Sequence, residues 1–126
     1  MAKLTDDEYE DAVERGKVVF ETEPHARSVR FDRKTGMVIV DLYNDCTFTF
    51  PPRQLQGLED ASDENLAQVE VNGLGYGLHW EALDADFTVR GLMAGRFGSE
   101  TFMAKHRKRL RAIMTQVLQQ QPPHAA

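Results

Sequence analysis

The amino-acid sequence predicts an α+β fold, an antiparallel meandering sheet with a β-hairpin, flanked by an N-terminal and a C-terminal helix. Apolar residues recur with helical spacing near both ends of the chain. Between these segments, over residues 26–50, apolar and polar residues alternate, which is typical of half-buried strands. A glycine-rich stretch within residues 69–80 joins two more short apolar runs and favours a hairpin turn.

The first helix is expected within residues 1–25. Thr5 and Glu8 form a capping box, in which each side chain satisfies a backbone N–H at the helix start. Pro24 ends the pattern. We expect the helix to cover the sheet, and the alternative is a detachable helix that binds a partner. Its apolar face consists of Tyr9, Ala12, Val13, Gly16, Val19 and Phe20.

Residues 26–95 are expected to form a small α+β domain. Turn residues at 32–36 and 44–45 separate three predicted strands, and two prolines end the third. The inward faces of these strands carry Val29 and Phe31, then Val38, Val40 and Leu42, then Cys46, Phe48 and Phe50. Cys46 is therefore expected in the core.

A second part of this domain follows the prolines. Ser62 is expected to cap a short helix that leads into the hairpin. Trp80 is expected to be buried between the sheet and the final helices, and Asp84 or Asp86 to cap the next helix. The predicted structural core consists of Trp80, Phe48, Phe50 and Leu78.

Residues 96–126 are expected to form a basic C-terminal helix, opened by Ser99, and a frayed polar tail, with all three segments in one structural domain. The apolar side of this helix consists of Phe102, Met103, His106, Leu110, Ile113, Met114, Val117 and Leu118. This side is longer than one small sheet face can cover, so it predicts an association surface centred on Leu110 and Met114.

Basic residues dominate the other side of the last helix. Lys105, Arg107, Lys108, Arg109 and Arg111 fall within seven positions. They form a solvated face, contact an acidic partner surface, or contact nucleic acid, which is the least favoured because no helix-turn-helix pattern accompanies them. The predicted partner-binding residues are Leu110, Met114, Lys105, Lys108, Arg109 and Arg111.

Charge is distributed unevenly along the chain. The formal net charge is -5, which argues against nucleic-acid binding by the chain as a whole. Residues 1–23 carry eight acidic against three basic residues, whereas from Ser99 to the end there are five basic residues against Glu100 alone. This asymmetry indicates that the two ends face each other, within one chain or between chains. The single cysteine and the polar start predict a cytoplasmic protein without a disulfide or membrane span.

One cluster invites a catalytic or metal-binding interpretation. His79, Glu81, Asp84 and Asp86 lie within eight residues. Their spacing matches no established metal-ligand pattern, and paired aspartates at a helix start commonly cap the backbone. We therefore expect no catalytic residue, metal or cofactor. An enzyme that uses His79 and the nearby acids is the distant alternative.

Several stretches between residues 29 and 95 carry a family resemblance. They are VRFD, DLYNDCTFTFPP, LEDASDENLAQVEV and, above all, GYGLHWEALDADFTVRGL. This segment resembles the bacterial family known as domain of unknown function 2442. The resemblance implies a compact α+β domain, found in relatives alone or fused to a DNA-binding helix-turn-helix module, and a role in toxin–antitoxin-like pairs. It implies no catalytic residues, and this chain lacks the second module.

These patterns lead to one main hypothesis and one alternative. The main hypothesis is a non-enzymatic protein-binding module, such as the antitoxin-like member of a pair, that binds a protein partner or forms a homo-oligomer. The alternative is a small transcriptional regulator that contacts DNA through the basic C-terminal helix.

Overall fold

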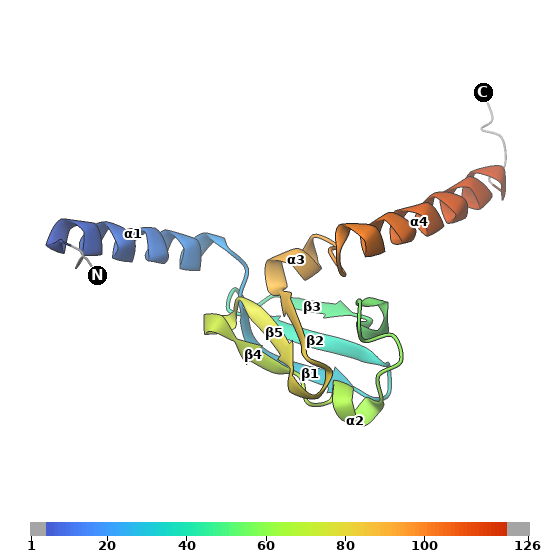
Figure 1. The fold of residues 1–126 in the computed structure, drawn as a ribbon, viewed down its shortest axis with the longest axis horizontal. Coiled ribbons are helices and arrows are strands. Elements are labelled where there is room, and N and C mark those ends of the chain that lie inside the picture. Colours follow the sequence, from blue (N-terminus) through green and yellow to red (C-terminus); the bar gives the residue numbers. More distant parts are fainter. Residues whose placement is uncertain (1–4, 121–126) are drawn as a thin grey trace.

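The computed structural model describes residues 5–120, without the side chains of residues 19–21, and it confirms the α+β fold class. Two three-stranded antiparallel sheets form a body, and one long helix leaves each end of it (Figure 1). The helices are α1 (Asp6–Thr22), α2 (Asp63–Leu66), α3 (Val89–Met93) and α4 (Glu100–Gln120), with 3-10 turns at Pro52–Gln54, Gly73–Gly75 and Glu81–Leu83.

The first sheet has the predicted meander. Its strands are β1 (Ala26–Asp32), β2 (Met37–Leu42) and β3 (Thr47–Phe50), in the order β1-β2-β3. Val40 of β2 pairs with Val29 on one side and with Phe48 on the other. The alternation in β2 buries Val38, Val40 and Leu42 and leaves the residues between them half-buried.

The second sheet contains the predicted hairpin and one strand that was not predicted. The hairpin pairs β4 (Glu70–Asn72) with β5 (Gly77–Trp80), and β6 (Ala85–Thr88) completes the sheet. The predicted helix caps at Asp84 and Asp86 are wrong, because Asp84 lies in a left-handed turn and Asp86 lies in β6. Thr88 caps α3 instead, and its hydroxyl accepts the Gly91 N–H at 3.0 Å. Pairing with β5 extends β6 up to that cap.

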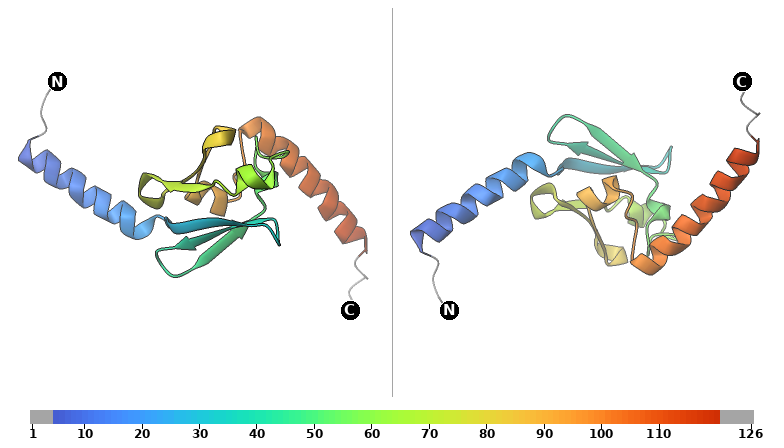
Figure 2. Two further views of the ribbon diagram at one scale, coloured as in Figure 1. Left: turned by 90° about the horizontal axis from the view of Figure 1, so that it is seen from below. Right: turned by 90° about the horizontal axis from the view of Figure 1, so that it is seen from above.

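The core lies between the two sheets, which Figure 2 shows as two layers. Trp80, Phe50 and Leu78 are buried as predicted, and Phe48 packs against them partly exposed. Trp80 was expected to lie against the final helices. Of the last two helices, only the short helix α3 contributes core residues, whereas α4 contains no fully buried residue.

Cys46 is exposed, so its expected place in the core is wrong. The residue precedes β3 and belongs to the turn after β2, where its N–H donates to the Asn44 side chain at 3.0 Å. Its carbonyl accepts the Leu42 N–H at 2.9 Å. These turn bonds remove Cys46 from the alternation that continues through Phe48 and Phe50.

The helix α1 has the predicted capping box but not the predicted location. The Thr5 and Glu8 side chains each accept the other residue's N–H at 3.1 Å. Residues 5–18 are exposed, and the helix projects away from the sheets (Figures 1 and 2). Val19 and Phe20 lie outside the described side chains. The expected cover over the sheet is wrong, because the second sheet already closes the apolar face of the first.

The helix α4 also projects from the body, at the opposite end from α1 (Figure 1). Its predicted cap is confirmed, because the Ser99 hydroxyl accepts the Phe102 N–H at 3.2 Å. The predicted frayed tail, residues 121–126, lies outside the described residues. Over the described part of the chain, no helix is long and apolar enough to cross a membrane.

Candidate protein-interaction surface

The first two turns of α4 hold the helix to the body. The Ser99 N–H donates to Gln56 Oε1 at 2.8 Å, and the Phe97 N–H donates to Met103 Sδ at 3.3 Å. The rings of Phe97 and His106 meet edge to face, with centroids 5.8 Å apart. The predicted association surface is therefore divided, because its first turns serve as an anchor.

Beyond this anchor, every residue of α4 is exposed. Large apolar side chains on this part have 44–60% of their surface exposed, and we call them the α4 stripe: Leu110, Ile113, Met114, Val117 and Leu118. They recur at intervals of three and four, so they share one side of the helix. The predicted partner-binding residues Leu110 and Met114 lie within this exposed surface.

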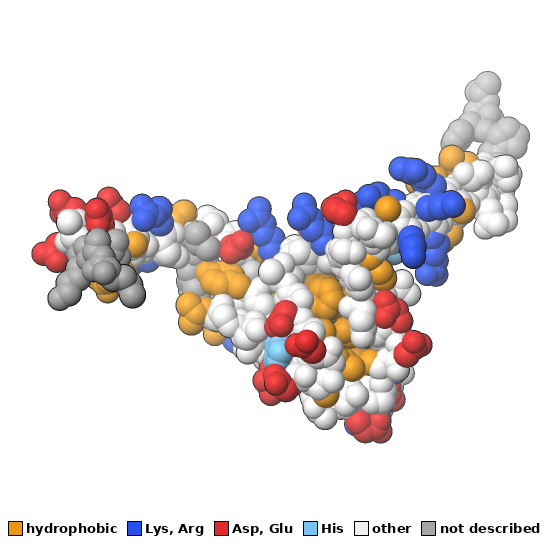
Figure 3. Space-filling view, in the orientation of Figure 1, with side chains coloured by type: hydrophobic (Ala, Val, Ile, Leu, Met, Phe, Trp, Pro, Cys, Tyr) orange, Lys and Arg blue, Asp and Glu red, His pale blue; other side chains and the backbone are white. Residues whose placement is uncertain are grey.

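The basic residues of α4 lie along both edges of the α4 stripe as well as on the opposite side of the helix. Figure 3 shows them as a blue band along the helix. At about 100° per residue, Arg107 and Arg111 follow one edge of the stripe, Arg109 lies near the other, and Lys105 and Lys108 lie behind it. All five are exposed. Among the described residues, their one ion pair joins Arg107 to Glu100 at 3.7 Å.

The helix α1 presents the opposite charge. It contains seven acidic and two basic residues, and Figure 3 shows acidic side chains gathered at its outer end. Its described apolar residues are also uncovered, with Tyr9 63% and Val13 38% exposed. Two amphipathic helices of opposite charge thus leave the same body without a described cover on either.

The cluster around His79 is a set of ion pairs on the second sheet. Its Nε2 lies 2.5 Å from Glu81 Oε2, and its Nδ1 lies 2.7 Å from Asp86 Oδ1. Register explains the second contact, because His79 in β5 pairs with Asp86 in β6. The hydrogen bonds to Glu81 and Asp86 raise the pKa of His79 above its ordinary value, and the bond to Glu81 has the larger effect.

This geometry supports a structural role for the cluster. Two carboxylates each engage one nitrogen of His79, which suits the doubly protonated ring and leaves no free nitrogen for a substrate or metal. The predicted fourth member, Asp84, lies in the turn before β6 and makes no described bond to the histidine. Within residues 5–120, no group of three or more metal-binding side chains is arranged to hold an ion.

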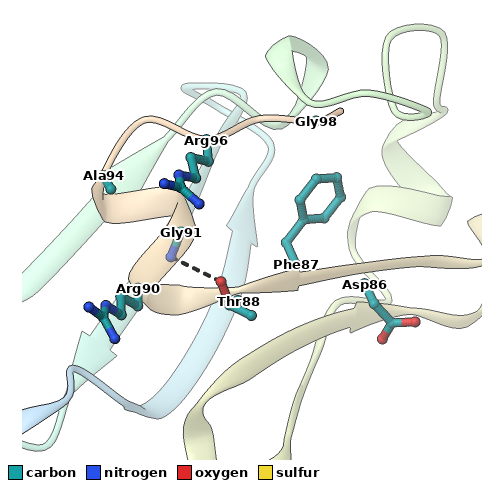
Figure 4. A pocket seen from close by; sticks show the side chains of 8 residues that line it. All are labelled: Asp86, Phe87, Thr88, Arg90, Gly91, Ala94, Arg96 and Gly98. Atoms are coloured by element: carbon teal, nitrogen blue, oxygen red, sulfur yellow. Dashed lines mark hydrogen bonds between the residues drawn. The ribbon is translucent and has the colours of Figure 1, made fainter. Parts of the chain in front are cut away.

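A hollow of about 580 Å³ lies beside α3 (Figure 4). Arg90 and Arg96 line one side of it, and Asp86 and Phe87 line another. Two of its polar groups have structural roles. The Thr88 hydroxyl caps α3, and Arg90 pairs with Glu23 at 3.1 Å. We find no nucleophile with an adjacent base among its lining residues.

An aromatic cluster around the buried His25, where α1 joins the body, was not predicted from the sequence. His25 is 8% exposed and its ring lies 4.9 Å from that of Tyr43 and 5.4 Å from that of Tyr76. Its Nδ1 lies 2.9 Å from the Glu23 carbonyl oxygen. The histidine directly follows Pro24, and no sequence pattern predicted that β1 would bury it.

Two solved structures resemble this chain closely. The crystal structure of a protein of unknown function from Rhodospirillum rubrum is 58% identical, with a TM-score of 0.63, and the match covers 65% of this chain and 99% of that one. The solution structure of an uncharacterised protein from Chromobacterium violaceum is 29% identical, with a TM-score of 0.62, over 84% of this chain and 96% of that one.

No curated protein matches this chain in sequence. The family model described as "Protein of unknown function (DUF2442)" matches residues 26–98, which span both sheets and α3 and end before α4 begins. The match covers more than half of the chain and agrees with the resemblance seen in the sequence. The chain therefore belongs to the DUF2442 family.

Proposed function

We propose that this protein is a non-enzymatic, cytoplasmic protein-binding module that engages its partner through the α4 stripe. The observation that supports this function is the exposure of five large apolar side chains on the part of α4 that projects beyond the two sheets. Burying one such side chain completely contributes about 1.5 to 3 kcal/mol. A partner that covered the α4 stripe would therefore gain substantial affinity from it.

The length of α4 supports the same function. The helix has 21 residues, but only its first two turns contact the body. Isolated helices are marginal in water, and most helices in proteins gain their stability from packing of an apolar face. Docking of a partner onto the outer turns would supply the packing that the body does not provide.

The remaining surface offers less for catalysis. Carboxylates contact both ring nitrogens of His79. In the hollow beside α3, the Thr88 hydroxyl caps a helix and Arg90 forms an ion pair. These arrangements favour a binding function over a hydrolytic or proton-transfer function. The antitoxin-like role is a special case of this proposal, in which the bound partner is a toxic protein whose activity the module suppresses.

The proposal is tested by changing the α4 stripe and measuring what the protein binds. Leu110→Asp with Met114→Asp places two charges within the stripe, whereas the control Ala104→Asp with Ala112→Asp adds the same charges on the exposed polar side. We expect the wild type and the control to self-associate or retain the same co-purifying protein, and the stripe variant to lose it. A wild type that neither self-associates nor retains a partner would contradict the proposed function.

A second candidate function is DNA binding through α4, because five exposed basic side chains fall within seven residues of the helix. Its test is fluorescence anisotropy of labelled duplex DNA over a range of salt concentrations. Binding that persists at physiological salt, and that is lost when Arg107 and Arg111 become Glu, would favour the regulator. We expect no such binding, because the whole chain is acidic.

A further inference from the structure

We propose that the partner is a second copy of this chain, in a symmetric dimer in which α1 of each protomer packs antiparallel against α4 of the other. This inference rests on the proposed protein-binding function and names its partner. Three features of the described chain support it: the charges of the two helices, their directions on the body, and the positions of charged residues beside their apolar faces.

The charges select the pairing. The helix α1 carries seven acidic and two basic residues, whereas α4 carries five basic residues and one acidic residue. Two copies of α1 would repel each other, and so would two copies of α4. Only the pairing of α1 with α4 brings opposite charges together while it covers an apolar face on each helix.

The directions explain why the pairing is between copies. In Figures 1 and 2, α1 and α4 leave opposite ends of the body and both run in the same sense across the molecule, so they diverge within one chain. A two-fold rotation perpendicular to that direction reverses the second copy. It therefore places each α1 alongside the partner's α4 in antiparallel orientation, and the two helix pairs form together.

The edges of the apolar faces agree with the antiparallel orientation. At about 100° per residue, Arg107 and Arg111 lie about 60° and 100° around α4 from Leu110. With the same rotation, Glu10 and Glu14 lie about 60° and 100° around α1 from Val13. The arginine edge of α4 and the glutamate edge of α1 therefore lie in the same direction of rotation from their apolar faces. When two helices face each other, such edges come together only if the helices run antiparallel.

In the resulting register, Arg107 lies beside the partner's Glu14 and Arg111 beside the partner's Glu10. The same register aligns the first turn of α4 with the last turn of the partner's α1, where each helix joins its body. Present partners do not block these contacts. Glu14 reaches Lys17 at 3.4 Å and Arg107 reaches Glu100 at 3.7 Å, and all four side chains are exposed, so these pairs are weak.

The first experiment measures molar mass by light scattering from micromolar to millimolar concentration. A 14.3 kDa chain is expected to reach twice its mass as the concentration rises. Glu10→Arg with Glu14→Arg (the α1 swap), and separately Arg107→Glu with Arg111→Glu (the α4 swap), should each raise the dimer dissociation constant by at least about tenfold, because like charges then meet at both helix pairs.

The decisive step mixes the two swapped proteins. Each is weakened alone, but in the mixture Arg on α1 meets Glu on α4, and the unchanged helices also meet opposite charges. We expect a one-to-one heterodimer about as stable as the wild-type dimer. Controls away from the edges are Asp11→Arg, compared with Glu14→Arg alone, and Lys105→Glu with Lys108→Glu, compared with the α4 swap. Each control should remain dimeric.

Each other outcome contradicts the inference in its own way. A wild type that stays monomeric at millimolar concentration overturns the dimer, but the proposed function survives if the α4 stripe still retains another protein. A dimer that the α1 swap leaves unchanged overturns the α1–α4 pairing. Equal losses in the swaps and in their controls would assign the effect to net charge. Circular dichroism of each variant confirms that the body remains folded.

Discussion

The indole N–H of Trp80 donates to the backbone carbonyl of Leu66 at 3.2 Å, inside a core in which both residues are fully buried. This bond joins the second sheet to α2, which lies in the connection between the two sheets. The ring also meets Phe87 edge to face, with centroids 6.2 Å apart. Trp80 therefore contributes a large buried surface and satisfies a carbonyl that water cannot reach.

Replacing Trp80 by Ala should destabilise the protein by about 3 to 5 kcal/mol, the usual cost of truncating a large core aromatic residue. Trp80→Phe should cost less, because it retains much of the apolar surface but leaves the Leu66 carbonyl without its donor. Urea unfolding followed by circular dichroism measures both values. Equal stability of the wild type and the alanine variant would disprove the central position of this side chain.

The pH dependence of stability should contain a contribution from His79. Its neighbours Glu81 and Asp86 raise its pKa in the folded protein above the ordinary histidine value of 6.5. A raised pKa means that the contribution is fully present below pH 6.5 and is lost as the pH rises through the folded pKa.

NMR titration of the His79 ring, together with melting temperatures from pH 5 to 9, would measure this effect. Glu81→Gln and Asp86→Asn should each lower the pKa of His79, the first by more, since the bond to Glu81 is the larger cause. His79→Gln should remove this pH-dependent contribution. A histidine that titrates below 6.5 in the wild type would contradict the described ion pairs.

Gly75 should be intolerant of any side chain. Its φ is +94°, and a Cβ at this position would overlap the Ala26 carbonyl oxygen. Gly73 supplies a matched control, because it also has a positive φ, +56°, but has open space where a Cβ would lie. We expect Gly73→Ala to cost about 1 kcal/mol, the usual penalty of the left-handed region, and Gly75→Ala to cost distinctly more. Equal losses in thermal unfolding would argue against the close approach of the hairpin to β1.

Cys46 should react with a thiol reagent in the folded protein without denaturant, because its side chain is exposed. Cys46→Ser should change the free energy of unfolding by no more than about 0.5 kcal/mol, as for most surface substitutions. Labelling kinetics followed by mass spectrometry provides the measurement. Protection from the reagent until the protein unfolds would restore the cysteine to the core.

Local signals in the sequence were sufficient for the helix starts and the turns. Thr5, Ser62 and Ser99 cap the helices that they were expected to cap, because a cap depends on residues only two or three positions away. The meander followed for the same reason, since short turns join neighbouring strands.

Errors arose where a distant segment decides the structure. Phe87 and Val89 have a spacing that both a strand and a helix can accommodate, and pairing with β5 makes Phe87 part of β6. With β6 counted as helix, no second sheet was predicted, and α1 was assigned to the position that this sheet occupies. The contacts of His79 with Glu81 and Asp86 likewise depend on the register between two strands.

The division between body and projecting helices has an evolutionary consequence. Substitutions on the exposed sides of α1 and α4 disturb no residue of the core, so mutations can alter what the helices bind without first overcoming a folding penalty. The family model spans the body and stops at residue 98, two positions before α4 begins. Selection on such a chain can conserve the sequence of the sheets while the sequences of the helices change, so that one scaffold acquires different binding specificities in different lineages.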